Sequence, residues 1–245
     1  MKKIFVYDLP TRFFHWLFAF LFIAAFAITK TVDDESPIFS YHMLAGLSIV
    51  FLLALRFIWG FIGTTYARFS SFKLNPVELI VYFKDAVVSK TKSYLGHNPA
   101  SSYAAVIMFA CAIGLAVSGI LMANGGENDT LEELHELLAN IFLISVIIHV
   151  VGIVFHHLKK RDSLWSSMLD GKKKTSSDAP GIAGTRPVAG LLLMVLFVSW
   201  LGYLATNYNS STQTLNLLGT ELRLGEAEHE AEGGYGEHEE EHDDD

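Results

Sequence analysis

The sequence has a single cysteine among 245 residues, so it can form neither an internal disulfide nor a cysteine-rich metal or iron–sulfur site. It also has no internal repeat, no glycine-rich phosphate-binding loop and no nucleophile motif. Cys111 lies inside an apolar run, where we expect it to pack as a small apolar residue. These absences exclude disulfide, iron–sulfur, phosphate-loop and nucleophile sites. The ten histidines are the remaining candidates for a functional site.

Charged residues are nearly absent from five segments of about 15 to 21 residues each. The membrane core is about 30 Å thick and is crossed by about 20 helical residues. A backbone in lipid must satisfy its own polar groups, which makes such spans helical. The chain is therefore expected to be an all-α membrane protein. The five runs are Phe13–Ile28, Tyr41–Phe61, Tyr103–Met122, Ile141–Phe155 (extended upstream by the amphipathic 134–140) and Val188–Ala205.

Lysine and arginine are distributed unevenly between the two sides that these spans define. One side has only Lys30 and Arg223, beside the acidic loops 33–35 and 127–136. Cytoplasmic loops keep an excess of positive charge, so we expect the N-terminus inside and the C-terminus outside. The basic residues of the inner side are Lys2, Lys3, Arg12, Arg68, Lys73, Lys84, Lys90, Lys92, Lys159, Lys160, Arg161, Lys172, Lys173, Lys174 and Arg186.

The net charge of −8 comes from the C-terminal tail, because twelve of the 26 acidic residues lie in Glu221–Asp245. The body before Thr206 has 17 basic and 14 acidic residues, a balance typical of a protein that faces anionic lipid. The tail from Gly225 is a low-complexity acidic run and is expected to be disordered. Three histidines lie in this tail: His229, His238 and His242. An acidic tail of this kind is more often solvated, with no specific ligand, than a metal-binding segment.

The spans and their connections suggest four parts: a four-helix membrane domain in residues 1–160, a cytoplasmic linker in 161–186, a fifth transmembrane helix in 187–206 and an external tail in 207–245, disordered at least from 225. Within the first part, the polar segment 63–101 is too hydrophilic to span. Its Asn75-Pro76-Val77-Glu78 start predicts a capped amphipathic helix on the inner surface.

A cleaved signal peptide is an alternative explanation of the first apolar run, which follows Lys2-Lys3. However, Asp8, Arg12 and His15 are untypical of a signal peptide. We therefore expect this run to be retained as the first span.

Four histidines lie in the first four spans, where ionisable side chains are costly and each needs a reason. A single such histidine is as often a hydrogen bonder between helices as a ligand. His135 and His149 lie fourteen residues apart, which advances a helix by about 21 Å and returns within about 40° of the same face. One helix can thus offer imidazoles at two depths of the membrane, with His42 near the outer one and His15 near the inner one. Two imidazoles at one depth are the axial ligands of a low-spin haem.

Several other residues could compete for the haems or contact them. His156 and His157 lie beside a basic cluster at the membrane edge, where an interfacial role is expected, and His97 is in a loop and is not expected to be a ligand. Arg56 could pair with a haem propionate or extend to lipid phosphate. Small residues permit close approach of a porphyrin or of a neighbouring helix; they are Gly46, Gly114 and Gly119.

Taken together, the motifs resemble the bacterial cytochrome b561 and nickel-hydrogenase b-type cytochrome family, which includes the membrane subunit of respiratory formate dehydrogenase. The resemblance covers about residues 5–160. The matching segments are Tyr7-Asp8-Leu9-Pro10-Thr11-Arg12-Phe13-Phe14-His15-Trp16, His42-Met43-Leu44-Ala45-Gly46, Arg56-Phe57-Ile58-Trp59-Gly60 and Gly96-His97-Asn98-Pro99, together with the spacing of His135 and His149.

This resemblance implies a four-helix haem-binding bundle in the bacterial inner membrane. The sequence departs from the simplest family pattern after residue 160, where it adds a fifth C-terminal transmembrane helix and the acidic tail. It implies two b haems, with His15 and His149 on the inner iron and His42 and His135 on the outer one. Family members pass electrons between quinone and an external hydrogenase, dehydrogenase or c-type cytochrome. Asn98 matches a position near the quinone in related subunits. The expected partners are membrane lipid, quinone and an external redox protein, and no nucleic acid.

Two other functions compete with an electron-transfer subunit of a quinone-linked complex. A stand-alone quinol or superoxide oxidoreductase would reduce quinone from a soluble donor without another subunit. A metal transporter or sensor would be colourless when pure and would lose metal uptake without the tail. The near absence of intramembrane acidic residues weighs against a cation pathway.

Overall fold

The computed structural model describes residues 2–88, 94–124, 128–160, 166–175 and 180–225. Five long helices are apolar enough to cross a membrane, which confirms the five predicted spans. They are α1 (Leu9–Thr31), α2 (Ser40–Ile62), α4 (Pro99–Ala123), α5 (Asp129–Lys160) and α7 (Pro187–Asn207). The shorter elements are α3 (Pro76–Val87), α6 (Ser167–Asp170), two 3₁₀ turns at Pro37–Phe39 and Phe69–Ser71, and strands β1 (Lys2–Phe5), β2 (Lys172–Thr175), β3 (Tyr208–Asn209), β4 (Thr214–Leu217) and β5 (Thr220–Arg223).

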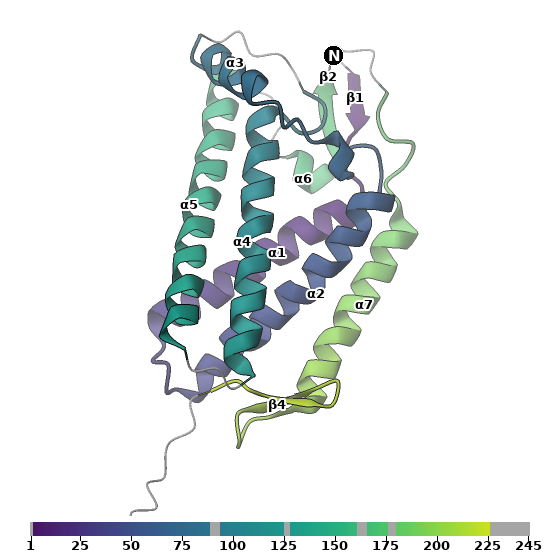
Figure 1. Cartoon of the computed structure of the whole chain (residues 1–245). Helices are drawn as coiled ribbons and strands as arrows, with labels where there is room; N and C mark the ends of the chain where they lie inside the picture. Colours follow the sequence, from purple (N-terminus) through teal and green to yellow (C-terminus); the bar gives the residue numbers. More distant parts are fainter. Residues whose placement is uncertain (1, 89–93, 125–127, 161–165, 176–179, 226–245) are drawn as a thin grey trace, which may run out of the picture.

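The first four spans form two helical hairpins, α1 with α2 and α4 with α5, and α2 joins them by packing against α4 (Figure 1). A buried cluster lies between α2, α4 and α5 and includes Leu53, Phe142 and Cys111. Cys111 is therefore buried and packs as an apolar residue, as predicted. The fifth span, α7, packs against α1 and α2, where Leu193 and Phe197 meet Phe14 and Leu52.

Local sequence signals determine where the helices begin. Asp8 caps α1 because its Oδ1 accepts a hydrogen bond from the Thr11 N–H at 2.9 Å. Asn75 caps α3 in the same way, which confirms the helix predicted after it. Asn98 and Ser101 form a reciprocal capping box at the start of α4.

The end of the bundle that carries the N-terminus is polar and has structure that the sequence analysis did not predict. Strand β1 pairs antiparallel with β2, which lies in the segment expected to be only a linker. The register places Lys2 opposite Thr175 and Phe5 opposite Lys172. This small sheet ties the N-terminus to the segment that leads into α7. We call this end the inner end.

The opposite, outer end is covered by a three-stranded sheet in the order β3-β4-β5 that follows α7 directly (Figure 1). Its buried leucines pack against Leu47 of α2 and Leu204 of α7. From the sequence these residues are expected to belong to an external tail, and no strands are predicted there. The predicted disorder concerns residues that, apart from residue 225, lie outside the described part of the chain.

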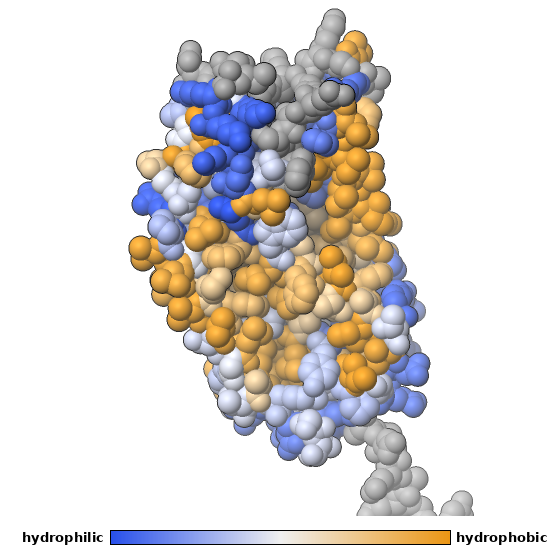
Figure 2. Space-filling model, turned by 180° about the vertical axis from the view of Figure 1, so that it is seen from behind, coloured by the Kyte–Doolittle hydropathy of each residue, from blue (hydrophilic) through white to orange (hydrophobic). Residues whose placement is uncertain are grey.

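The surface of the bundle matches a membrane environment. Figure 2 shows hydrophobic side chains gathered over the middle of one face, with hydrophilic residues toward both ends. Many large apolar side chains are exposed on the long helices, among them Ile148, Leu191 and Phe61. Such a continuous apolar surface is stable only in contact with lipid or another apolar partner.

Candidate functional site

The outer histidine pair consists of His42 on α2 and His135 on α5. The centroids of their rings are 6.2 Å apart and the ring planes meet at 69°. Two imidazole nitrogens that each lie about 2 Å from one metal ion place the ring centroids about 6 Å apart. The two rings are therefore spaced as two ligands on opposite sides of one iron atom would be.

A backbone carbonyl determines the tautomer of His42. Its Nδ1 lies 3.0 Å from the carbonyl oxygen of Ala25 on α1. A carbonyl oxygen can only accept, so Nδ1 must carry the proton and donate it. Neutral His42 then has its free lone pair on Nε2, the atom available to a metal.

The Ser118 hydroxyl group favours the same tautomer in His135. Its Nδ1 lies 2.8 Å from Oγ of Ser118, and that hydroxyl has the Gly114 carbonyl oxygen within 2.9 Å as an acceptor for its own proton. Ser118 is thus positioned to accept from Nδ1–H of His135. Both rings of the outer pair can present Nε2 as the free donor atom.

The three glycines singled out in the sequence differ in what surrounds them. A Cβ at Gly46 would meet nothing within 4 Å, so open space lies beside α2 one turn after His42. A Cβ at Gly119 would lie 3.4 Å from Cε1 of His135, and one at Gly114 would lie 2.6 Å from Leu138 Cδ1. The space beside Gly46 is therefore open, whereas Gly114 lies in close contact with a neighbouring helix.

The inner pair consists of His15 on α1 and His149 on α5, both half-buried. A charge on His149 would act on His15, so both side chains lie toward the same, inner end of the bundle. The Nδ1 atom of His15 is buried and has no hydrogen-bond partner among the described residues. Burying a ring nitrogen without a hydrogen-bond partner costs free energy of folding. A polar or metal-containing group bound at the inner site would reduce that cost.

Arg56 is half-buried at the inner end, near enough to His97 for its charge to act on that ring. Its Nη2 donates to the Ala67 carbonyl oxygen at 3.0 Å, and its guanidinium lies over the rings of Phe69 and Phe109 at 5.2 and 5.7 Å. Its Nη1 is buried and has no partner among the described residues. A cation held this way has a free donor for an anionic group.

His97, which the sequence analysis did not expect to be a ligand, lies at the same end. Its ring is 4.8 Å from the ring of Phe72, and its buried Nδ1 has no partner in the described part of the chain. Burial, and then the positive charges of Arg56 and Lys173, lower the pKa of His97 to about 4. His97 is therefore a neutral polar group at the inner site at physiological pH.

Asn98, the candidate quinone contact, caps the start of α4. Its Oδ1 accepts from the Ser101 N–H at 2.8 Å, and its own N–H donates to Oγ of Ser101 at 2.9 Å. These bonds hold the start of α4 next to His97. They leave only the side-chain NH₂ group of Asn98 available as a donor to a ligand.

Asp8 is a buried residue whose role the sequence analysis did not predict. Its carboxylate caps α1, accepts from Oγ1 of Thr64 at 2.6 Å, and accepts from Nε1 of Trp59 at 3.2 Å. It thereby ties the start of α1 to the end of α2. Its negative charge also acts on Arg56. The signal in the sequence was an acidic residue directly before an apolar span, which is the pattern of a helix cap.

The chemistry of these donors fits a b haem at each pair. Each pair supplies two imidazoles, and the inner end adds buried polar atoms that have no partner among the described residues. Among the described residues no group of three or more His, Cys, Asp or Glu side chains gathers as a bare metal ion would require. His156 and His157 lie near the inner end of α5, and the tail histidines fall outside the described residues.

Residues 6–171 match the family model described as prokaryotic cytochrome b561. The chain belongs to this family. Curated relatives named "Probable Ni/Fe-hydrogenase B-type cytochrome subunit" come from Rhizobium leguminosarum bv. viciae, 25% identical over 70% of this chain and 89% of the relative, and from Azotobacter vinelandii, 26% identical over 72% and 91%. A similarly named relative from Rhodobacter capsulatus is 24% identical over 72% and 83%. No solved structure gives a significant match.

Family membership together with the five spans makes this protein a multi-pass membrane b-type cytochrome that functions in electron transfer. A b-type cytochrome carries haem b. The family model covers both hairpins and ends at residue 171, so α7 and the outer sheet lie beyond it.

Proposed function

We propose that this cytochrome holds two haems in series, one on His15 and His149 and one on His42 and His135, and connects quinone at its inner end with a redox protein at its outer end. The outer pair carries the proposal. Its 6.2 Å ring separation and its two engaged Nδ1 atoms match bis-histidine ligation through Nε2. When bound, haem iron supplies reversible one-electron chemistry, and two histidine ligands leave it no open position for oxygen.

The residues around the inner pair are suited to hold the charged edge of a haem. Arg56 offers its unpaired Nη1, and His97 offers a buried Nδ1 nearby. A carboxylate placed between them would satisfy both groups and would offset the cost of burying them. Quinone is assigned to the same end, where the NH₂ group of Asn98 is the remaining donor of the loop before α4.

The partner at the outer end is proposed from the names of the relatives, which are subunits of Ni/Fe hydrogenases. A hydrogenase outside the membrane is therefore the first partner to test, and a dehydrogenase or c-type cytochrome the next. The basic inner end supports a cytoplasmic N-terminus in the bacterial inner membrane, and with this orientation the outer sheet would face the periplasm.

Electron transfer in series is tested in proteoliposomes that contain the purified cytochrome and quinol, with ferricyanide as the membrane-impermeant acceptor outside. The quinol should reduce haem in the native protein, and the vesicles should then reduce ferricyanide. In His135→Ala the quinol should still reduce the inner haem, while the rate of ferricyanide reduction by correctly oriented molecules falls at least tenfold. His156→Ala, on the same helix, should behave as the native protein. An unchanged rate in His135→Ala would contradict the proposal.

A further inference from the structure

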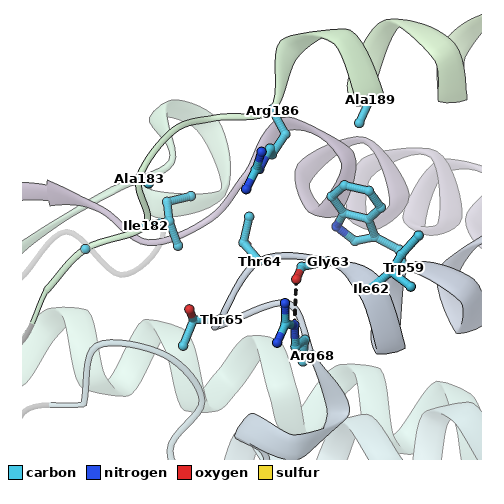
Figure 3. Close-up of a pocket in the computed structure, with 11 residues that line it drawn as sticks. Trp59, Ile62, Gly63, Thr64, Thr65, Arg68, Ile182, Ala183, Arg186 and Ala189 are labelled. Carbon is cyan, nitrogen blue, oxygen red and sulfur yellow. Dashed lines mark hydrogen bonds between the residues drawn. The ribbon is translucent and has the colours of Figure 1, made fainter.

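A pocket of about 550 Å³ lies at the inner end, between the last turn of α2 and the segment that leads into α7 (Figure 3). None of the histidines lines it, so it is separate from both proposed haem sites. Its walls come from two stretches of chain, residues 59–68 and 181–189. Its lining includes Ile62, Gly63, Thr64, Arg68 and Arg186.

Two arginines face each other across this pocket, and no acidic residue lines it. Arg68 is held in place because its Nε donates to the Gly63 carbonyl oxygen at 2.7 Å (Figure 3). Its terminal nitrogens remain available. Neither Arg68 nor Arg186 has a carboxylate partner anywhere in the described ranges of the chain. Two unpaired guanidinium groups so placed repel each other and favour an anion between them.

The backbone of Arg186 supports a site at this position. Arg186 precedes the first turn of α7 with φ 53° and ψ 53°, in the left-handed region that a non-glycine residue adopts only at a cost. Strain of this kind persists where the surroundings fix it, and it is concentrated at functional sites. In Figure 3 the Arg186 side chain extends toward Thr64, on the side of the pocket opposite Arg68.

The rim of the pocket is apolar where it meets the membrane. Ile62 lines the pocket and is 66% exposed, and Val188, directly after the Arg186-Pro187 corner, is 80% exposed. Both belong to helices that are long and apolar enough to cross a membrane, so their exposed faces are expected to contact lipid. An occupant would therefore have a negative group between the arginines and an apolar part along the two helices, which a free inorganic anion does not have.

We propose that this pocket binds the phosphate of an anionic phospholipid such as phosphatidylglycerol, with its acyl chains along α2 and α7. Basic pockets between transmembrane helices on the cytoplasmic side are suited to anionic headgroups. Planar guanidinium groups match phosphate oxygens by paired hydrogen bonds. A lipid bound here would fasten α7, the helix beyond the family match, to the end of α2.

Native mass spectrometry of the intact cytochrome from mixed micelles tests this site. The native protein should retain phosphatidylglycerol in preference to phosphatidylethanolamine. Arg186→Gln should weaken retention about fivefold, since one basic side chain at an anionic bilayer surface contributes about that factor. Gln keeps the Cβ and therefore the backbone strain of the native residue. Arg186→Lys should retain most of the binding, and Arg223→Gln, at the outer end, should retain all of it.

A second measurement separates lipid from a soluble anion and from misfolding. Inorganic phosphate at millimolar concentration should not displace the bound phosphatidylglycerol, and the haem absorbance of Arg186→Gln should equal that of the native protein. Equal retention of both lipids by the native protein would overturn the proposal. Undiminished phosphatidylglycerol binding in the Arg68→Gln, Arg186→Gln double variant would overturn it as well, and displacement by phosphate would show a site for soluble anions.

Discussion

At the residue scale, Ala25 and Ser118 act on the outer pair through one hydrogen bond each. Neither residue reaches the iron position in the proposed site, but each engages Nδ1 of a histidine and leaves Nε2 free. Groups that orient metal-binding histidines in this way typically change metal affinity 10- to 100-fold when removed. The chemistry of the outer site therefore depends on residues that would not be identified as ligands.

Replacing Ser118 tests this dependence. We expect Ser118→Ala to weaken retention of the outer haem by about tenfold, because His135 loses the acceptor for its Nδ1–H. Haem loss during dilution into haem-free detergent, followed by absorbance, measures the effect. Ser145→Ala is the matched control, since the Ser145 hydroxyl bonds only to its own helix at the Ile141 carbonyl. Equal haem loss in the two variants would show that the Ser118 bond has no such role.

His97 gives the inner end a defined response to acid. Its pKa is lowered to about 4 in the folded protein from an ordinary value near 6.5, so the unfolded chain binds a proton over a range where the folded protein does not. Folding stability from this group is complete above about pH 6.5 and is lost as the pH falls toward 4, by at most about 3 kcal/mol.

The measurement is the unfolding temperature of the native protein and of His97→Gln between pH 7.5 and 4.5. The native protein should lose more stability on acidification than the variant does. Parallel curves for the two proteins would contradict the assignment of a neutral, buried His97.

At the scale of elements, α7 and the outer sheet form one unit that covers the bundle. Trp200 of α7 stacks on Phe51 of α2 with ring centroids 4.7 Å apart. Leu215 of β4 is fully buried in the leucine cluster against which Trp200 packs. The fifth helix is therefore part of the core of this protein. Its sheet packs against the outer end of α2, next to His42.

Leu215→Ala should destabilise the outer end by about 2–5 kcal/mol, because a fully buried leucine is removed from a packed cluster. Leu218→Ala, three residues on and 84% exposed, should have almost no effect. Limited proteolysis after α7 compares the two variants directly. If both variants were cut at the same rate as the native protein, the sheet would not be held by this cluster.

The elements differ in how far the sequence could predict them. The five spans follow from run length and low charge, and Asn75 and Asp8 stand where capping residues belong. The strands could not be predicted, because two to four residues are too few for an alternating pattern. β1 and β2 pair across most of the chain, so no local signal marks them. The membrane position of His15 was predictable, whereas the place of His97 depends on how a loop folds back.

For the molecule as a whole, the charge distribution predicts its orientation. The inner end carries β1, β2 and most of the lysines, while the outer end carries the sheet after α7. We expect the inner end to face the cytoplasm.

Single cysteines in a Cys111→Ala background test this orientation, because the chain has no other cysteine. A membrane-impermeant maleimide should label Ser210→Cys in spheroplasts, and should label Ser70→Cys only after the membrane is broken; both positions are exposed. The reverse labelling pattern would invert the proposed topology.

The most direct test of the central claim, two haems on two histidine pairs, is the number of haems per purified chain by pyridine haemochrome. The native protein and His156→Ala should contain about two b haems. His42→Ala and His135→Ala should each lose the same single haem, identified by its absorbance band, and His15→Ala and His149→Ala the other. A folded native protein with fewer than two haems, or paired variants that lose different haems, would contradict the account.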